Sequence, residues 1–458
     1  MKNKCILICL IGLFLVTNLG WSQTKPWTLR ECVEFAMKNN ISIQQSELDL
    51  QASQLTKKDA IGNYLPNLNA NTSHSWNIGL NQNITTGLLE NQTTQYTSAG
   101  LNSNVTIYNG LQNYNRLRRS NLSILSSQYQ LAKMKDDIGL NVANSYLQIL
   151  FNKENLKVQQ EQLANDEKQL KRAEELVKVG AVPRGDLLDA QATVAADQQR
   201  VIAAENTLFL SKLSMTQLLQ LEDFKNFDTA DTSFEAVLSL PLSETPETIL
   251  AKAKQERVEL KIARTNLAGA ESDLKIAKGA LQPSIVGFYG FGTRASYADR
   301  IIGVDANGSF ILTGPKSLID QFSDNKGHNF GFQLSIPILN GFNASNAVSR
   351  SKIALERSKI AQKQAELDLE RNVFTAITDA KGALNAYESA RSALRARRSA
   401  FEYAQEKFNV GMMNSFELSQ AQTLYSNAQS ELIRTKYDYI FKVKVVEFYF
   451  GIPIVDKL

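Results

Sequence analysis

Two motifs recur in this chain at one fixed separation. Asn109-Gly110 and Asn340-Gly341 lie 231 positions apart, and Val179-Gly180 and Val410-Gly411 are separated by the same distance. Because both motifs share one offset, the stretch between them has the same length in both halves. Similarity at a fixed period indicates an internal repeat. The sequence therefore predicts a two-fold repeat, which limits the fold to one built from two similar pieces.

The stretch between the two motifs has the pattern of a very long helix. Leu156, Leu163, Leu170 and Val177 recur every seven residues, which is the spacing of a coiled coil. The positions 231 residues later are also apolar or aromatic: Tyr387, Leu394, Phe401 and Phe408. A continuous helix over residues 110–180 would extend ~100 Å at ~1.5 Å per residue. We therefore expect two long helical hairpins, with tips near residues 180 and 411.

The earlier part of each half repeats at a shorter offset. Pro66 and Pro283 lie 217 positions apart, so an insertion is expected between Pro283 and Asn340. Residues 296–317 are rich in Gly, Asn and Asp, which favours a loop for the extra length. Residues 221–247 lose the heptad spacing and are interpreted as a connector between the repeats.

The residues that follow Pro66 change to an alternation with a period of two, which indicates strands. Over residues 66–80, Asn and Ser occupy one face, while Leu68, His74, Trp76 and Ile78 are on the other. Strands are also expected near residues 97–109, 283–292 and 329–339. Such a two-faced sheet is typical of two structures: a half-buried sheet over a core, and a membrane β-barrel with lipid outside and water inside.

The N-terminus favours the membrane barrel. Lys2 and Lys4, the apolar run Cys5–Val16, and the small residues Gly20 and Ser22 predict a secretory signal peptide over residues 1–22. An uncleaved anchor is the alternative. Lipid tolerates no open sheet edge, and four strands cannot close a useful barrel. Several chains must then pool their strands, and three chains would supply 12.

The expected fold is mainly α, with a small membrane β-barrel. Each chain would contribute four transmembrane strands and a long antiparallel coiled-coil part of an α-barrel. The expected organisation is a signal peptide at residues 1–22, a first repeat at 23–220, a connector at 221–247 and a second repeat at 248–458.

In this order, the motifs resemble the TolC-like outer-membrane factor family, also called outer membrane efflux proteins. The segments that carry the resemblance are TLRECVEFAMKNN, YLPNLN, IYNG, ILNG, VGAVPRGDLLDAQ and VGMMNSFELSQAQ, and the similarity covers about residues 26–453. The resemblance implies a homotrimer whose 12-stranded barrel lies in the outer-membrane lipid of a Gram-negative bacterium. The barrel would continue into an α-helical barrel in the periplasm.

The resemblance also implies a function and partners. It implies a passive exit duct of a tripartite efflux or type I secretion system, working with a periplasmic adaptor and an inner-membrane pump. A periplasmic coiled-coil adaptor or structural scaffold protein is the alternative. The first would form trimers in the outer membrane, and the second would be a soluble periplasmic protein.

The hairpin tips are the first candidate site. On their residues alone, a glycine after a long helix is a helix C-terminus that uses a left-handed backbone. The resemblance adds that the tips contact the adaptor. The residues implied are Val179, Gly180, Ala181, Val182, Val410, Gly411, Met412 and Met413.

Three acidic residues next to the tips form the second candidate site. Asp186, Asp189 and Glu417 lie where a helix begins, and the simplest interpretation is that they stabilise the helix dipole. The resemblance carries Asp186 and Glu417 onto acidic positions at the periplasmic entrance. In a trimer each carboxylate would be repeated three times, and such a ring favours cations. Asp189 has Gln420 as its counterpart, so the argument for a second ring is weaker.

The sequence offers no catalytic chemistry. It has no nucleophile motif, phosphate-binding loop or Cys cluster, and His74 and His328 lie 254 positions apart. We therefore expect no enzyme, no cofactor and no metal site, and the absence of a basic block argues against nucleic acid. The two Asn-Gly motifs (Asn109, Gly110, Asn340 and Gly341) are interpreted as junctions where a membrane strand passes into a long helix.

Overall fold

The computed structural model describes residues 26–83, 85, 87–222, 224–231 and 244–452. The predicted signal peptide and residues 232–243 of the predicted connector lie outside these residues. The chain divides into two compact units, and each unit draws on both halves of the sequence. The first unit holds the residues up to 48, residues 130–260 and those from 364 onward, and the second holds residues 49–129 and 261–363.

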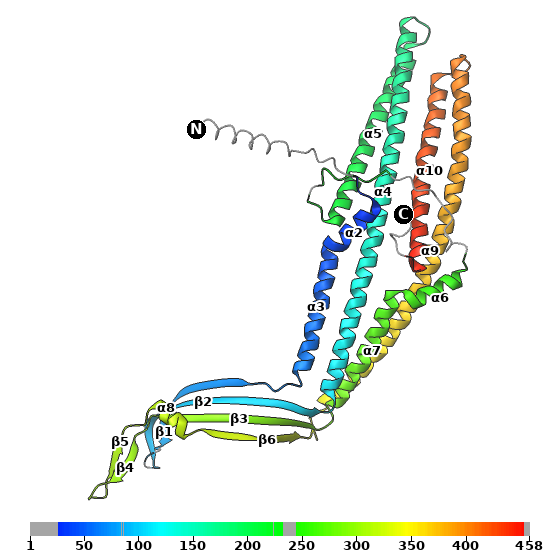
Figure 1. Ribbon diagram of the computed structural model, residues 1–458. Helices are drawn as coiled ribbons and strands as arrows, with labels where there is room; N and C mark the ends of the chain where they lie inside the picture. Colours follow the sequence, from blue (N-terminus) through cyan, green and yellow to red (C-terminus); the bar gives the residue numbers. More distant parts are fainter. Residues whose placement is uncertain (1–25, 84, 86, 223, 232–243, 453–458) are drawn as a thin grey trace, which may run out of the picture. The chain divides into compact units, whose positions relative to one another are not determined.

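Long helices dominate the chain (Figure 1). The longest two, α4 and α9, contain 67 residues each, and α5 and α10 return from their ends to complete two hairpins. Among the described residues, none of the helices combines the length and apolar composition needed to cross a bilayer. The helix bounds are α2 Leu29–Asn39, α3 Ile41–Gly62, α4 Gln112–Lys178, α5 Arg184–Leu219, α6 Pro246–Glu256, α7 Val258–Gly279, α8 Leu318–Asp324, α9 Asn343–Asn409 and α10 Ser415–Tyr449.

Two hydrophobic cores hold the helices of the first unit together. The first core centres on Tyr146 and packs α2 against α4, α5 and α10. The second centres on Val373 and packs α6 and α7 against α9 and α10. Cys32 of α2 is 0% exposed in the first core, and burial raises the pKa of its thiol to about 12. The thiol is therefore a packing group, because only the thiolate is reactive.

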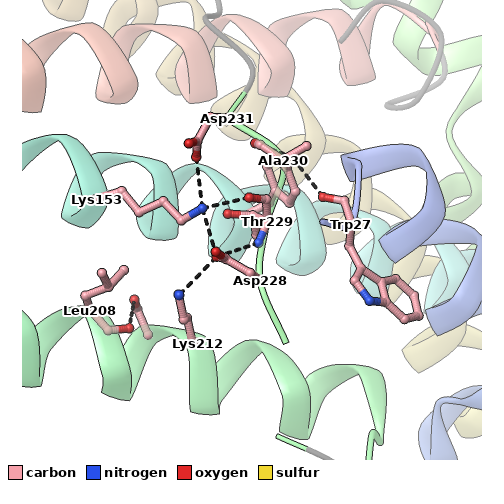
Figure 2. A network of polar contacts seen from close by, with 10 residues as sticks. Trp27, Lys153, Leu208, Lys212, Asp228, Thr229, Ala230 and Asp231 are labelled. Atoms are coloured by element: carbon pink, nitrogen blue, oxygen red, sulfur yellow. Dashed lines mark hydrogen bonds and ion pairs between the residues drawn. The ribbon is translucent and has the colours of Figure 1, made fainter. Parts of the chain in front are cut away.

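The residues just before α2 are held by the connector (Figure 2). The Trp27 N–H donates to the Asp228 carbonyl at 2.8 Å, and the Ala230 N–H donates to the Trp27 carbonyl at 2.8 Å. Lys153 of α4 reaches Asp228 and Asp231 at 2.8 and 2.9 Å, and Lys212 of α5 reaches Asp228 at 3.0 Å. Burial alone would raise the pKa of Asp228, but the hydrogen bonds from the two lysines lower it overall.

The second unit contains a four-stranded antiparallel sheet with the order β1-β2-β3-β6. Its strands are β1 Asn69–Gln82, β2 Leu89–Asn109, β3 Ser284–Ser296 and β6 Gly327–Ser335. Strand β2 begins eight residues before the predicted start at 97. Strand β6 ends at Ser335 rather than near 339, because Pro337 follows and has no N–H for the ladder.

The insertion predicted as a loop is structured, and that prediction is wrong. Strands β4 (Arg300–Val304) and β5 (Phe310–Thr313) pair as a hairpin, and the short helix α8 follows. The strands read RIIGV and FILT and are mostly apolar and β-branched, a composition that favours strands. Their flanking Gly, Asn and Asp residues belong to the turn, where Asp305 accepts the N–H groups of Asn307 and Ser309.

The register of the sheet separates two faces. One row of directly opposed residues reads Ala70, Leu101, Phe291 and His328, and the next row, on the opposite face, reads Asn69, Asn102, Gly290 and Asn329. The apolar face also carries exposed Trp76, Ile78, Phe330, Phe332 and Leu334. The apolar Val286 and Phe288 are opposed to Thr106 and Asn104 and so lie on the amide face, where Phe288 covers Gly331.

Both Asn-Gly junctions turn the chain with two successive left-handed residues. Gly110 and Leu111 have φ of 65° and 61°, and Gly341 and Phe342 have φ of 58° and 64°. At the first junction the side chain of Asn109 accepts the N–H of Asn113 at 3.2 Å, so Asn109 caps the start of α4. Gly110 also packs on Gly279 so closely that a Cβ at Gly110 would lie 2.2 Å from the Gly279 carbonyl oxygen.

Candidate functional site at the hairpin tips

The ends of α4 and α9 have the same backbone geometry. Gly180 and Gly411 adopt φ of 73° and 78°. The following residues, Ala181 and Met412, donate their N–H groups to carbonyls five positions earlier, at 2.9 and 2.8 Å. This is the Schellman arrangement, in which a left-handed glycine satisfies the last carbonyls of a helix. A Cβ at either glycine would meet no described atom within 4 Å, so the backbone conformation alone favours glycine there.

The helices that leave the tips start differently. Asn414 caps α10 by accepting the Glu417 N–H at 2.8 Å, whereas Pro183 precedes α5 without a side-chain cap. Asp186 and Glu417 each lie in the first turn of their helix, where a carboxylate is favoured by the helix dipole. Asp189 lies one turn further along α5.

A cavity of about 460 Å³ opens between the two tips. Of the predicted site residues, six contribute to its lining: Ala181, Val182, Asp186, Asp189, Gly411 and Met413. Glu417 is outside this lining. Val179, Val410 and Met412 are also outside it and project as exposed apolar side chains. The structure therefore brings two of the three predicted carboxylates together and leaves the third at the other helix start.

Two polar contacts tie the hairpins together around this cavity. Arg172 of α4 donates to Asn409 of α9 at 3.0 Å and stacks over the Phe408 ring at 5.0 Å. Asp166 of α4 accepts from Gln422 of α10 at 3.0 Å and from Gln162 at 2.7 Å. Asp166 also lines the cavity, so a change at Asp166 acts directly on the seam between the two hairpins.

The comparison with known families decides the class of protein. The family model described as outer membrane efflux protein matches residues 33–219 and 249–443, a range that includes the first hairpin, the second hairpin as far as residue 443 and all four strands of the sheet. The chain belongs to the outer membrane efflux protein family. It is accordingly an outer-membrane protein of the Gram-negative cell envelope that extends into the periplasm, as the sequence predicted.

Individual outer-membrane proteins resemble this chain over nearly its whole length. The outer membrane protein TolC of Vibrio cholerae is 23% identical over 451 residues, which cover 95% of this chain and 93% of TolC. The outer membrane channel CmeC of Campylobacter jejuni has a TM-score of 0.78 at 18% identity, covering 92% and 85% of the two chains. VceC of Vibrio cholerae has a TM-score of 0.76 at 13% identity, covering 93% and 96%. CmeC is described as an outer membrane channel.

Sequence reasoning missed the two most buried carboxylates among the described residues. Asp166 is 5% exposed, and Asp197 of α5 is 1% exposed. A usable signal was present, because Asp197 interrupts the apolar stripe Val194, Val201 and Ala204 at helical spacing. A carboxylate within a buried stripe predicts a partner, although the sequence does not say which.

Proposed function

We propose that three copies of this chain form an exit duct that passes substrates from the periplasm to the exterior. The observation that carries the proposal is the β1-β2-β3-β6 sheet, whose apolar face is exposed in the single chain. Trp76 of β1 and Phe330 and Phe332 of β6 have no covering atoms of their own chain over most of their surface. Aromatic and aliphatic side chains of this kind are stable against lipid.

The edges of the sheet require further copies. Within the described sheet, β1 and β6 each pair on one side only, and lipid does not tolerate unpaired N–H and carbonyl groups. Pairing β1 of one copy with β6 of the next removes every edge. Three chains then give a barrel of 12 strands, with the Asn and Ser face turned toward a water-filled lumen.

Helices α3 and α9 also carry apolar stripes that are exposed in the single chain. On α3, Ile41, Leu48 and Leu55 are exposed at a spacing of seven. On α9, exposed side chains recur with the same spacing at Ile353, Ile360, Leu367 and Phe374. Heptad stripes are the surfaces through which helices pack side by side in coiled coils. Burying them between copies would build the periplasmic α-barrel of a homotrimer.

The tips supply the proposed entrance. Val179, Val410 and Met412 form an exposed apolar rim that suits a protein partner, and we assign it to a periplasmic adaptor joined to an inner-membrane pump. Asp186, Asp189 and Glu417 would form carboxylate rings that favour cations. The entrance would open when the hairpins move apart, a rearrangement of coiled-coil packing. The system served is either efflux or type I secretion.

Planar bilayer recording of the purified protein tests the duct. The double variant Asp186→Asn with Glu417→Gln should raise single-channel conductance and weaken block by divalent cations, because it removes six charges per trimer. Glu406→Gln, an exposed neighbour of the second tip, is the matched control and should leave both quantities unchanged. Currents that are the same in all three proteins would argue against the carboxylate entrance.

The oligomeric state separates the duct from the alternative function. A heat-modifiable trimer in the outer-membrane fraction is expected for the duct. A soluble periplasmic monomer would instead identify an adaptor or scaffold protein and would overturn the proposal. Replacing Leu48 and Leu55 of α3 with glutamate should shift the protein from trimer to monomer on gel filtration in detergent.

A further inference from the structure

The short helix α8 takes the place of a strand at the far end of the sheet, which is the end remote from the Asn-Gly junctions. Strand β6 begins at Gly327, whereas its neighbour β3 continues beyond that level to Ser296. There, Gln321 of α8 accepts the Ser296 N–H and donates to the Ser296 carbonyl, both at 2.9 Å. Asn325, at the end of the helix, donates to the Arg294 carbonyl at 2.7 Å. The side chains of α8 thus satisfy main-chain groups of β3 that a longer β6 would have paired.

The side of α8 that faces away from β3 is apolar and exposed. Ile319 is 78% exposed. At ~100° per residue, it lies about 160° around the helix from Gln321 and about 120° from Asn325, the two side chains that bind β3. The orientation of the helix is fixed further, because Thr293 of β3 donates to the Phe322 carbonyl at 2.8 Å. Ile319 is therefore held outward, away from its own sheet.

Strand β1 is longer than the strand that pairs with it between copies in the proposed barrel. It contains 14 residues, whereas β6 contains 9, and about 9 residues are enough to cross the bilayer. Both strands join a helix at their near end, β1 after α3 and β6 before α9. The excess of β1, residues 78–82, therefore lies at the far end, beyond the lipid.

This excess part of β1 has an open edge and apolar side chains. The Asn67 N–H, just before β1, donates to the Asn104 carbonyl of β2 at 3.0 Å. Main-chain groups alternate in direction along a strand, and β1 keeps one register with β2 along its length. The main-chain groups of Ile78 and Leu80 are therefore directed away from β2, toward the open edge. The side chains of both residues are exposed.

We propose that α8 of one copy packs against the far part of β1 in the next copy, with Ile319 in contact with Ile78 and Leu80. Because α8 stands in line with β6, a β1 that pairs with β6 must run past α8. The contact continues the seam between copies beyond the end of the β1–β6 ladder. It rests on the proposed function, since it requires copies that assemble through β1 and β6.

The charges around α8 fit a second copy of the chain. Residues 77–82 of β1 are uncharged. On α8, Asp324 pairs with Lys316, and Asp320 accepts from the Ser317 hydroxyl at 2.6 Å, so both carboxylates of the helix are bound within their own chain. The contact that remains is uncharged on both sides, and burial of Ile319 against aliphatic side chains removes apolar surface from water.

Disulfide cross-linking of the full-length protein in detergent tests this contact. The double variant Ile319→Cys with Ile78→Cys places one thiol on α8 and one on β1. Mild oxidation with copper phenanthroline should join different copies, so that most of the protein runs as covalent dimers and trimers on denaturing gels without reductant. Native Cys32 is fully buried and does not compete. Ile319→Cys with Leu80→Cys should give the same bands, and it serves if the first variant folds poorly.

Asn77 provides the matched control. Its side chain points to the opposite face of β1 from that of Ile78, so Ile319→Cys with Asn77→Cys should lose the cross-linked bands at the same oxidation time. Each single-cysteine variant should also lack them. Light scattering before oxidation gives the number of copies independently.

The outcomes separate this contact from the duct itself. A trimer in which neither the Ile78 nor the Leu80 pair forms a disulfide would overturn the contact and leave the proposed duct in place. Equal cross-linking through Asn77 and Ile78 would also overturn it, because random collision would then account for the bands. A monomer before oxidation would overturn the proposed function and the contact together.

Discussion

The two cores of the helical unit are built at related positions but with different side chains. Cys32 and Ala36 of α2 correspond, at the 217 offset, to Ile249 and Ala253 of α6, and all four are buried. At the 231 offset, Tyr146 corresponds to Ile377. The Tyr146 hydroxyl donates to the main-chain oxygens of Trp27 and Ala230 at 3.2 and 3.1 Å, whereas Ile377 has no such group. The first core is thereby joined to the connector, and the second depends on apolar packing.

The hairpins and junctions differ in the same way. The buried Asp166 and Asp197 of the first hairpin correspond to Arg397, which is exposed, and Ala428. The close approach of Gly110 to Gly279 has no counterpart at Gly341, where a Cβ would meet no described atom within 4 Å. Apolar spacing is thus similar in the two halves, while the contacts of Tyr146, the buried Asp166 and the close approach of Gly110 are particular to the first. The first half should therefore be the more sensitive to single substitutions.

The largest losses of stability are expected in the cores. Tyr146→Ala should lower the free energy of unfolding by about 4 kcal/mol and Ile377→Ala by about 3 kcal/mol, since each leaves a cavity in a packed core. Urea unfolding followed by far-ultraviolet circular dichroism measures both. Tyr146→Phe removes only the hydroxyl and should cost about 1 kcal/mol. Equal losses for the Tyr146 and Ile377 alanine variants, with no loss in Tyr146→Phe, would show that the connector contacts add nothing.

The junctions provide a more closely matched pair. Gly110→Ala adds a Cβ that meets the Gly279 carbonyl and also strains a left-handed residue, and it should cost about 3 kcal/mol. Gly341→Ala adds only the strain of a left-handed backbone and should lower the free energy of unfolding by about 1 kcal/mol. Thermal melting of the two variants in the same detergent compares them directly. A Gly341→Ala protein that melts below the Gly110→Ala protein would contradict the close packing at the first junction.

Much of the fold was predictable because it depends on spacing along one strand or helix. The heptads that end at Val177 and Phe408 predicted the long helices, and the alternation around Trp76 predicted β1. The start of β2 was missed because residues 90–95 are polar on both faces and give no alternation. The β4–β5 hairpin was missed because its apolar runs are only four or five residues long, between turn residues that dominate the composition.

The site was predictable only in part, for a related reason. The tip glycines can be predicted from the local sequence, because the end of a helix determines their backbone conformation. Asp166 and its hydrogen-bond partner Gln422 lie 256 positions apart in the sequence and on different hairpins. Helix propensity and heptad position carry no information on which faces of two such helices meet. That contact is a property of tertiary packing, and a polar residue in an apolar stripe is its only trace in the sequence.

The smallest expected difference concerns the connector and its response to acid. The folded-state pKa of Asp228 is lowered by Lys153 and Lys212, so its contribution is present above the unfolded pKa of about 3.9 and is lost as the pH falls through the folded value. Asp228→Asn should therefore lower the free energy of unfolding by about 1 kcal/mol at neutral pH, a figure reduced for partial exposure, and should have no effect at low pH.

The matched control is Asp379→Asn, which removes an ion pair to a single lysine, Lys442, at 2.9 Å in the second half. Its cost should be about half as large. Urea midpoints at neutral and acid pH distinguish the outcomes. A loss for Asp228→Asn that persists in acid would indicate that its hydrogen-bond geometry, rather than its charge, holds the connector to the first half.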